Sequence, residues 1–101
     1  MNVMKLMKQA AEMQENIRKL QEDLAVREYA FTAGGGSVTA VAGGDMTIKK
    51  IEISPAAVDP TDVEMLQDVI LAAVNGALNA ARESAAAEMA KITGGLKIPG
   101  L

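Results

Sequence analysis

Apolar residues recur at alternating steps of four and three through the first quarter of the chain. This spacing places them in one stripe along a helix, at the period typical of helix–helix packing. Residues 1–27 contain no Gly or Pro, so they predict one continuous helix of roughly 40 Å. A narrow stripe on so long a helix needs a partner, so we expect a second helix or a second copy of the chain to cover it. The stripe consists of Leu6, Ala10, Met13, Ile17, Leu20 and Leu24.

The apolar period changes to two after this helix. Residues 28–53 predict three short strands, because apolar and polar residues alternate between glycine-rich turns at residues 34–36 and 43–45. Alternation fails at Lys49 and Lys50, where Ile48 and Ile51 would face opposite sides, so we expect a β-bulge there. Short turns between consecutive strands favour a three-stranded antiparallel meander.

A second long helix is predicted over residues 60–93. Asp59 suits the N-cap, Pro60 the first helical position, and Asp62 the positive end of the helix dipole. We expect the larger apolar residues, up to Val74, to pack on the sheet, and the alanine-rich remainder to approach another helix or to project. The apolar stripe steps at close to 3.6 residues and consists of Val63, Leu66, Ile70, Ala73, Ala77, Ala81, Ala85, Met89 and Ile92.

The helix is expected to stop at Gly94 and Gly95, leaving an irregular tail over residues 94–101. Inside the predicted helix, Gly76 follows Asn75, and glycine is unfavourable in the interior of a helix. This residue therefore predicts a close backbone approach at a dimer core or a slight bend. The order is α-β-β-β-α. We therefore predict an α+β fold in one domain spanning residues 1–101.

The composition argues against catalysis and metal binding. The 101 residues include no Cys and no His, which removes thiolate ligands, the commonest general base and the commonest nitrogen ligand for metals. No nucleophile motif or phosphate-binding loop is present, so we expect no enzyme activity and no cofactor. Lys5 interrupts the start of the chain, and the longest apolar run covers only residues 69–74. Neither a signal peptide nor a membrane span is expected, which makes the cytoplasm the default location.

Several segments, in order and over essentially the whole chain, form one recognisable set: residues 6–10, 13–15, 21–25, 34–36, 49–53, 62–68, 72–75 and 89–101. Together they resemble the YbaB/EbfC family of bacterial nucleoid-associated proteins. The resemblance implies a cytoplasmic homodimer in which two three-stranded sheets join and long helices project like tweezers. It also implies binding to double-stranded DNA, a change in DNA conformation, and roles in nucleoid organisation and gene expression.

Basic residues on the two helices are the DNA-binding candidates once that resemblance is considered. The formal charge is −3, but locally clustered Lys and Arg decide phosphate contact because salt screens distant charges. The alternative is a solvated face balanced by Glu12, Glu15, Glu22, Glu83 and Glu88. No recognition helix is evident, so we expect mostly sequence-independent binding. The candidates are Lys5, Lys8, Arg18 and Lys19 on the first helix, and Arg82 and Lys91 on the second.

A second function remains open at the level of sequence. The chain could be a dimeric protein–protein interaction module, an adaptor for a DNA repair or replication partner, with weak or no DNA binding. Its acidic balance and its seven Met residues favour this alternative, because Met side chains adapt to varied partners. The protein partner would be unidentified.

Overall fold

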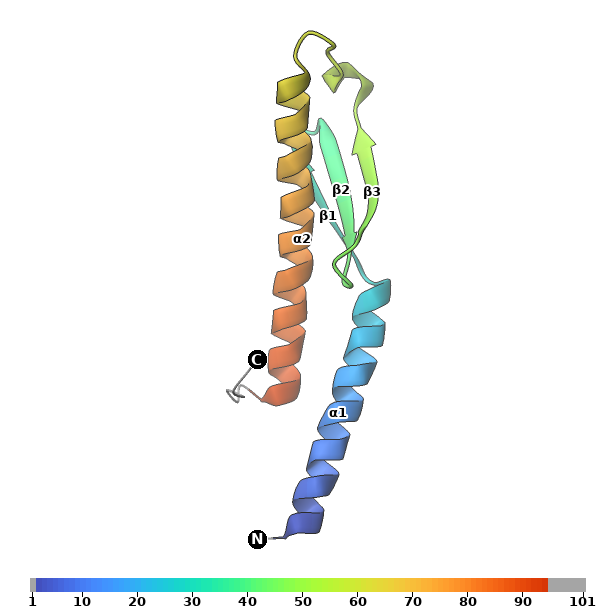
Figure 1. Ribbon diagram of the computed structural model, residues 1–101, viewed down its shortest axis with the longest axis vertical. Helices are drawn as coiled ribbons and strands as arrows, with labels where there is room; N and C mark the ends of the chain where they lie inside the picture. The colour runs from blue at the N-terminus through green and yellow to red at the C-terminus, as the bar shows by residue number, and fades with distance from the viewer. Residues whose placement is uncertain (1, 95–101) are drawn as a thin grey trace.

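The protein is described here by a computed structural model that covers residues 2–94. Its elements follow the predicted α-β-β-β-α order and form an elongated molecule of 70 × 22 × 16 Å (Figure 1). The α+β fold with an antiparallel three-stranded sheet is confirmed. The elements are α1 (Val3–Val26), β1 (Glu28–Ala33), β2 (Val38–Gly43), β3 (Ile48–Ile53), the 3-10 turn η1 (Pro55–Ala57) and α2 (Val63–Thr93).

The sheet is a meander with the spatial order β1-β2-β3. Both strand pairs are antiparallel, and the β2–β3 register shifts where Val41 pairs with Lys50 and Ala42 pairs with Ile48. Lys49 therefore has no residue directly opposite, which confirms the bulge that the broken alternation predicts. The bulge returns Ile48 and Ile51 to the same face of the sheet.

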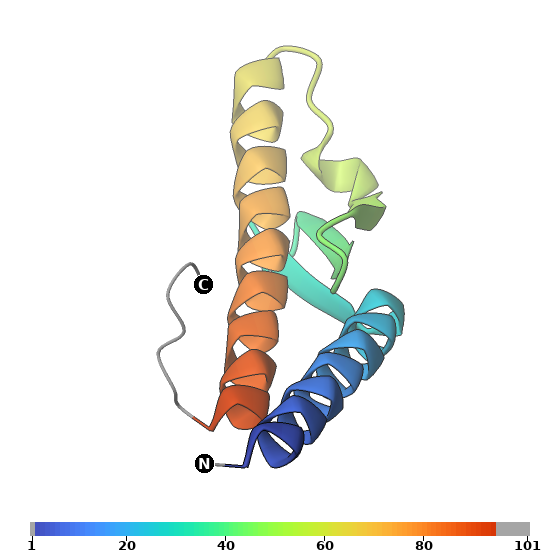
Figure 2. The same ribbon diagram turned by 60° about the horizontal axis from the view of Figure 1, so that its bottom comes forward.

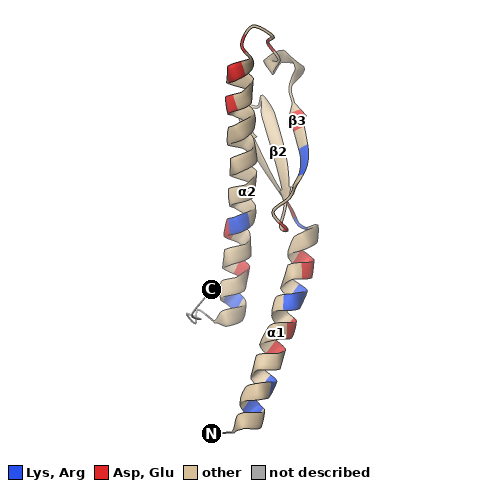
Figure 3. Ribbon diagram, viewed as in Figure 1, with Lys and Arg blue, Asp and Glu red and all other residues tan. Residues whose placement is uncertain are grey.

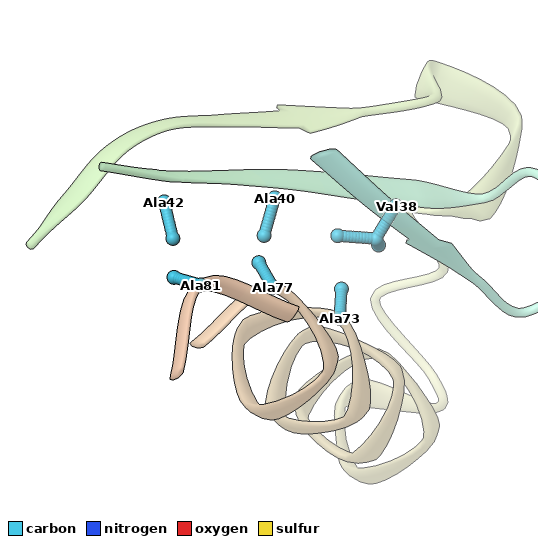
Figure 4. Close-up of a cluster of buried hydrophobic side chains, with 6 residues drawn as sticks. All are labelled: Val38, Ala40, Ala42, Ala73, Ala77 and Ala81. Carbon is cyan, nitrogen blue, oxygen red and sulfur yellow. The ribbon is translucent and has the colours of Figure 1, made fainter. Parts of the chain in front are cut away.

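The core lies between one face of β2 and the middle of α2 (Figure 4). Ala73, Ala77 and Ala81 lie at i, i+4 and i+8, so they share one face of the helix. They pack against Val38, Ala40 and Ala42, and Val38 is the largest side chain that is fully buried. As expected, the larger residues up to Val74 pack on this core, among them Leu66, Val69 and Ile70. The expectation that the alanine-rich remainder approaches another helix or projects is wrong for Ala77 and Ala81, which also pack on β2. Small side chains allow the helix axis to approach β2 closely, so the alanines form the centre of the contact.

Asp62, rather than Asp59, caps α2. The Met65 backbone N–H donates to the Asp62 carboxylate at 3.2 Å, which satisfies one of the free donors of the first turn. Asp59 instead accepts bonds from the Thr61 N–H at 2.9 Å and the Thr61 hydroxyl at 2.7 Å. That local turn holds Pro60 outside the helix, so the predictions for Asp59 and Pro60 are wrong. Gly94 ends α2 with a φ of 63° as predicted, whereas Gly95 and the predicted tail lie outside the described residues.

Gly76 marks a close approach within the chain. The ring of Phe31 lies so near that a Cβ on Gly76 would be 2.2 Å from the Phe31 Cδ1 atom. Neither a bend nor a dimer contact is therefore needed to explain this glycine. The missing side chain makes room for an aromatic ring from β1, which sequence spacing alone does not connect with α2.

Helix α1 packs on the rest of the chain from its middle to its end, and its first turns are exposed. Leu20 and Leu24 are buried, whereas Leu6 and Ala10 at the other end of the stripe are exposed. The first turns of α1 extend along the long axis beyond the end of α2 (Figures 1 and 2). Within residues 2–94, two of the six stripe residues, Leu6 and Ala10, therefore have no partner.

Candidate nucleic-acid interface

Three lysines share one side of α1. Lys5, Lys8 and Lys19 fall within an arc of about 60° around the helix axis, because 3.6 residues make a turn. This arc points away from the buried Leu24. The helix projects from the sheet with basic and acidic positions along its length (Figure 3), and these three lysines are exposed. Three of the four sequence candidates on α1 thus lie on a surface that a phosphate backbone can reach, and Glu12 lies within the same arc.

Arg18 differs from these lysines because two carboxylates bracket it. It forms ion pairs with Glu15 and Glu22, one helical turn away on either side. The hydrogen bond from Arg18 holds the pKa of Glu15 below its ordinary value. The same contacts raise the pKa of Arg18 further. The charge of Arg18 is therefore largely balanced within the helix, as expected for a solvated i,i+4 network.

The two candidates on α2 also have local partners. Lys91 pairs with Glu88 at 3.1 Å, and Arg82 donates to the side-chain oxygen of Asn79 at 2.6 Å. Of the described residues, none forms an ion pair with Arg82, Lys5, Lys8 or Lys19. The structure therefore divides the six candidates into four cations without a carboxylate partner and two, Arg18 and Lys91, that are paired.

The lysines of the sheet are paired too. Lys49 contacts Asp45 at 3.1 Å across the β2–β3 turn, and Lys50 contacts Glu52 along β3. These pairs leave little net positive charge on the strand. Helix α1 itself contains as many acidic as basic residues. Of the six candidates, those that lack a carboxylate partner within residues 2–94 are therefore Lys5, Lys8 and Lys19 on α1 and Arg82 on α2, while Arg18 and Lys91 are paired.

Charge is segregated along the molecule. Residues 2–11, which form the free end of α1, contain Lys5 and Lys8 and no acidic residue. Residues 53–81 contain four acidic residues and no Lys or Arg. Figure 3 shows these basic and acidic segments at opposite ends of the long axis. A net charge of −3 therefore conceals a locally basic helix end.

A set of polar contacts fixes the other end of α1. Arg27 follows the helix and lies 3.7 Å from Glu88 of α2, and its carbonyl accepts from the Gly44 N–H at 3.1 Å. The hydroxyls of Tyr29 and Ser84 are 2.7 Å apart and join β1 to α2. Sequence reasoning missed these positioning residues, since they come from separate elements. Together they set the direction in which α1 projects.

Residues 2–94 contain no group of three His, Cys, Asp or Glu side chains that could hold a metal ion. No helix in the same range has the length and apolar character needed to cross a membrane.

Comparison with known proteins identifies the family. The model of the YbaB/EbfC DNA-binding family matches residues 1–96. A nucleoid-associated protein of Thermoanaerobacter sp. (strain X514) is 56% identical over 99% of this chain and 90% of its own. One from Pelotomaculum thermopropionicum is 55% identical over 99% of this chain and 95% of its own.

A solved structure supports the fold independently. The crystal structure of an uncharacterized protein from Helicobacter pylori superposes with a TM-score of 0.72 at 21% identity, covering 83% of this chain and 88% of that one. At this identity the likeness concerns the fold alone. The family is one of DNA-binding proteins and is not a known enzyme family. On the evidence of its sequence over nearly its whole length, this chain belongs to the YbaB/EbfC DNA-binding family.

Proposed function

We propose that this chain is a nucleoid-associated protein that binds double-stranded DNA as a homodimer, mostly independently of sequence. The observation that carries the proposal is the set of unpaired lysines, Lys5, Lys8 and Lys19, on one side of a projecting helix. Relatives named nucleoid-associated proteins at 54–56% identity support it. The protein would act in the cytoplasm, on the nucleoid, where changes in DNA conformation would influence gene expression.

Local charge explains how an acidic protein binds a polyanion. Screening reduces interactions beyond about 8 Å at physiological salt, so the four acidic residues at the far end of the molecule have little effect on α1. Each lysine that contacts a phosphate releases counterions. A dimer presents six such lysines, which gives an expected slope of log K against log salt of about −5. Few base-reading groups accompany them, so affinity should vary little with sequence.

The homodimer is proposed from apolar surface that the chain itself does not cover. Helix α2 packs on β1 and β2, whereas β3 forms a sheet edge. Ile51 and Ile53 pair with the buried residues Ala40 and Val38, so they point to the same face of the sheet as α2. They remain 43% and 38% exposed. An exposed apolar edge strand is a natural place for association with a second copy.

Light scattering coupled to size exclusion tests the homodimer. The wild-type chain should elute with twice the mass of one chain. Ile51→Glu should yield monomer, because it places a charge in the proposed apolar contact. Lys50→Gln is the matched control, since Lys50 directly precedes Ile51 on β3 and faces the other side of the sheet. A wild-type monomer at micromolar concentration would contradict the proposal.

A salt-titrated binding assay on fluorescent duplexes tests the DNA contact. The triple variant Lys5→Ala, Lys8→Ala and Lys19→Ala should weaken binding by at least about tenfold and reduce the salt slope. The loss of binding affinity should be equal for two duplexes of unrelated sequence. Arg18→Ala and Lys91→Ala should have smaller effects, because carboxylates already balance these charges. Equal effects from the paired and unpaired sets, or no binding at low salt, would contradict the assignment.

The alternative adaptor function is favoured by one observation. Val3, Met4 and Met7 are exposed on the first turns of α1, and apolar side chains are not what phosphates require. Affinity capture from a nuclease-treated lysate separates the two functions. A specific protein retained without DNA, together with no measurable duplex affinity, would favour the adaptor.

A further inference from the structure

The free end of α1 combines apolar and basic side chains. The α1 tip, defined here as residues 3–8, exposes 81% of Met4 and 66% of Met7. Lys8 lies one turn after Met4 on the same face of the helix, and Lys5 lies about 100° around the axis from Met4. Such exposed apolar surface next to unpaired charge is characteristic of a protein-binding site.

The opposite end of the molecule contains a groove. It lies between the first turns of α2 and the β1–β2 turn and has a volume of about 430 Å³. Its apolar part includes Met65, Val69 and Gly34. Met65 is 63% exposed, so this surface is also incompletely covered by the described chain. We call this site the α2 groove.

The α2 groove has an acidic rim, formed by Asp62, Glu64 and Asp68. Asp62 is engaged as the helix cap, whereas Glu64 and Asp68 form no ion pair within residues 2–94. The groove thus offers apolar surface bordered by negative charge. The apolar surface of the groove suits the exposed methionines of the α1 tip, and its negative charge suits the lysines of the α1 tip.

From this complementarity we infer that copies of the chain associate end to end, with the α1 tip of one copy seated in the α2 groove of another. Met4 and Met7 would contact Met65, and Lys5 and Lys8 would face Glu64 and Asp68. The two sites lie at opposite ends of a 70 Å molecule (Figures 1 and 3), so one chain cannot satisfy both by itself. A contact between different surfaces leaves one of each free after every step, so it builds open chains, or rings where the rotation between copies closes.

End-to-end association is compatible with the proposed homodimer. The α2 groove is lined by Ala33 and Gly34, at the end of β1, whereas the proposed dimer surface involves Ile51 and Ile53 of β3. These strands are the two opposite edges of the sheet. A dimer joined through β3 therefore keeps both α2 grooves and both α1 tips available, and dimers would be the repeating units of the chain.

Cross-linking between two single-cysteine variants tests the contact directly. The natural chain has no Cys, so Met4→Cys and Met65→Cys can be mixed and treated with a short bis-maleimide, without DNA and at low salt. The mixed Met4–Met65 product should exceed either self-linked product about tenfold. Val26→Cys replaces Met4→Cys as control, because Val26 is also well exposed and lies at the other end of α1. If the yield of the Met4–Met65 product is no greater than the yield of the Val26–Met65 product, the inference is overturned.

A charge swap keeps the test independent of a damaged fold. Lys5→Glu with Lys8→Glu should reduce the mixed product about tenfold, and pairing this variant with Glu64→Lys and Asp68→Lys should restore it. Asp62 is left intact because it caps α2. Failure of the swapped pair to restore cross-linking overturns the inference. Since no DNA is present, these results are independent of the proposed DNA binding.

Discussion

At the scale of single residues, the β2–β3 turn contains an unusual backbone conformation at Met46. The glycines and aspartate of residues 43–45 predict a tight turn, and the turn forms, closed by the Met46 N–H to the Gly43 carbonyl at 3.0 Å. The residue with left-handed backbone is Met46, at a φ of 64°, and it is the only residue other than Gly described with positive φ within residues 2–94. No composition rule selects Met for this position, because its side chain is disfavoured there.

Replacing Met46 with Gly should therefore stabilise the protein. Glycine adopts this backbone without steric cost, and Met46 is partly exposed, so little packing is lost. We expect the free energy of unfolding in urea to rise by about 0.5–1 kcal/mol. Met46→Ala serves as the control, since it removes the same side chain but keeps the Cβ atom. A Gly variant no more stable than the Ala variant would show that the left-handed backbone carries no cost.

At the scale of elements, periodicity predicted both long helices, the three strands and the bulge. It could not locate the caps exactly, because Asp59 and Asp62 are equally good capping residues and only Thr61 decides between them. It also predicted too short a packed region on α2, because Ala77 and Ala81 belong to the core as well. A stripe of apolar residues identifies the face of a helix that is buried, but the depth of contact depends on how closely the backbones approach, and here alanines on α2 meet alanines on β2.

The junction between α1 and the sheet depends on another close approach. A Cβ on Gly44 would lie 2.1 Å from the carbonyl oxygen of Leu24, and backbone atoms cannot move aside as a flexible side chain can. Gly44→Ala should therefore lower the free energy of unfolding by about 1–3 kcal/mol. Gly35→Ala is the contrasting variant. Gly35 lies in the β1–β2 turn, where a Cβ atom would meet open space, so this variant tests backbone strain alone. Equal losses in hydrogen-exchange protection of α1 for both variants would contradict this account.

At the scale of the whole molecule, the candidate site was predictable only in part. The sequence lists every basic residue, but which of them form ion pairs depends on helix geometry. Glu15 and Glu22 lie one turn before and after Arg18 and pair with it. Lys5 and Lys8 precede the first acidic residue of the chain. The segregation of charge between the two ends also needs the fold, because only the meander sends α2 back along the molecule from the far end. Neither property follows from the net charge.

Stability should depend on protein concentration if the chain folds as a dimer. The fully buried side chains of one chain are small, with Val38 the largest, and a molecule of this size buries too little surface to be very stable alone. The urea midpoint should therefore rise as protein concentration is raised from 1 to about 100 μM. Ile51→Glu should abolish this dependence. A wild-type midpoint that is constant over this range would show that the single chain is sufficient.

DNA and end-to-end association should compete, since both proposals use Lys5 and Lys8. A phosphate and the acidic rim of the α2 groove cannot occupy the same ammonium groups at once. Adding duplex DNA to the mixed Met4→Cys and Met65→Cys proteins should lower their cross-linking in proportion to the fraction of protein bound. Lys19→Ala separates the two activities, because Lys19 lies about 16 Å along the helix from Lys8, outside the α1 tip. This variant should cross-link as well as its parent but need more DNA to suppress the product. Cross-linking that persists at saturating duplex would mean that the tip is not a phosphate contact, and the DNA surface would then have to lie nearer Lys19 and Arg82.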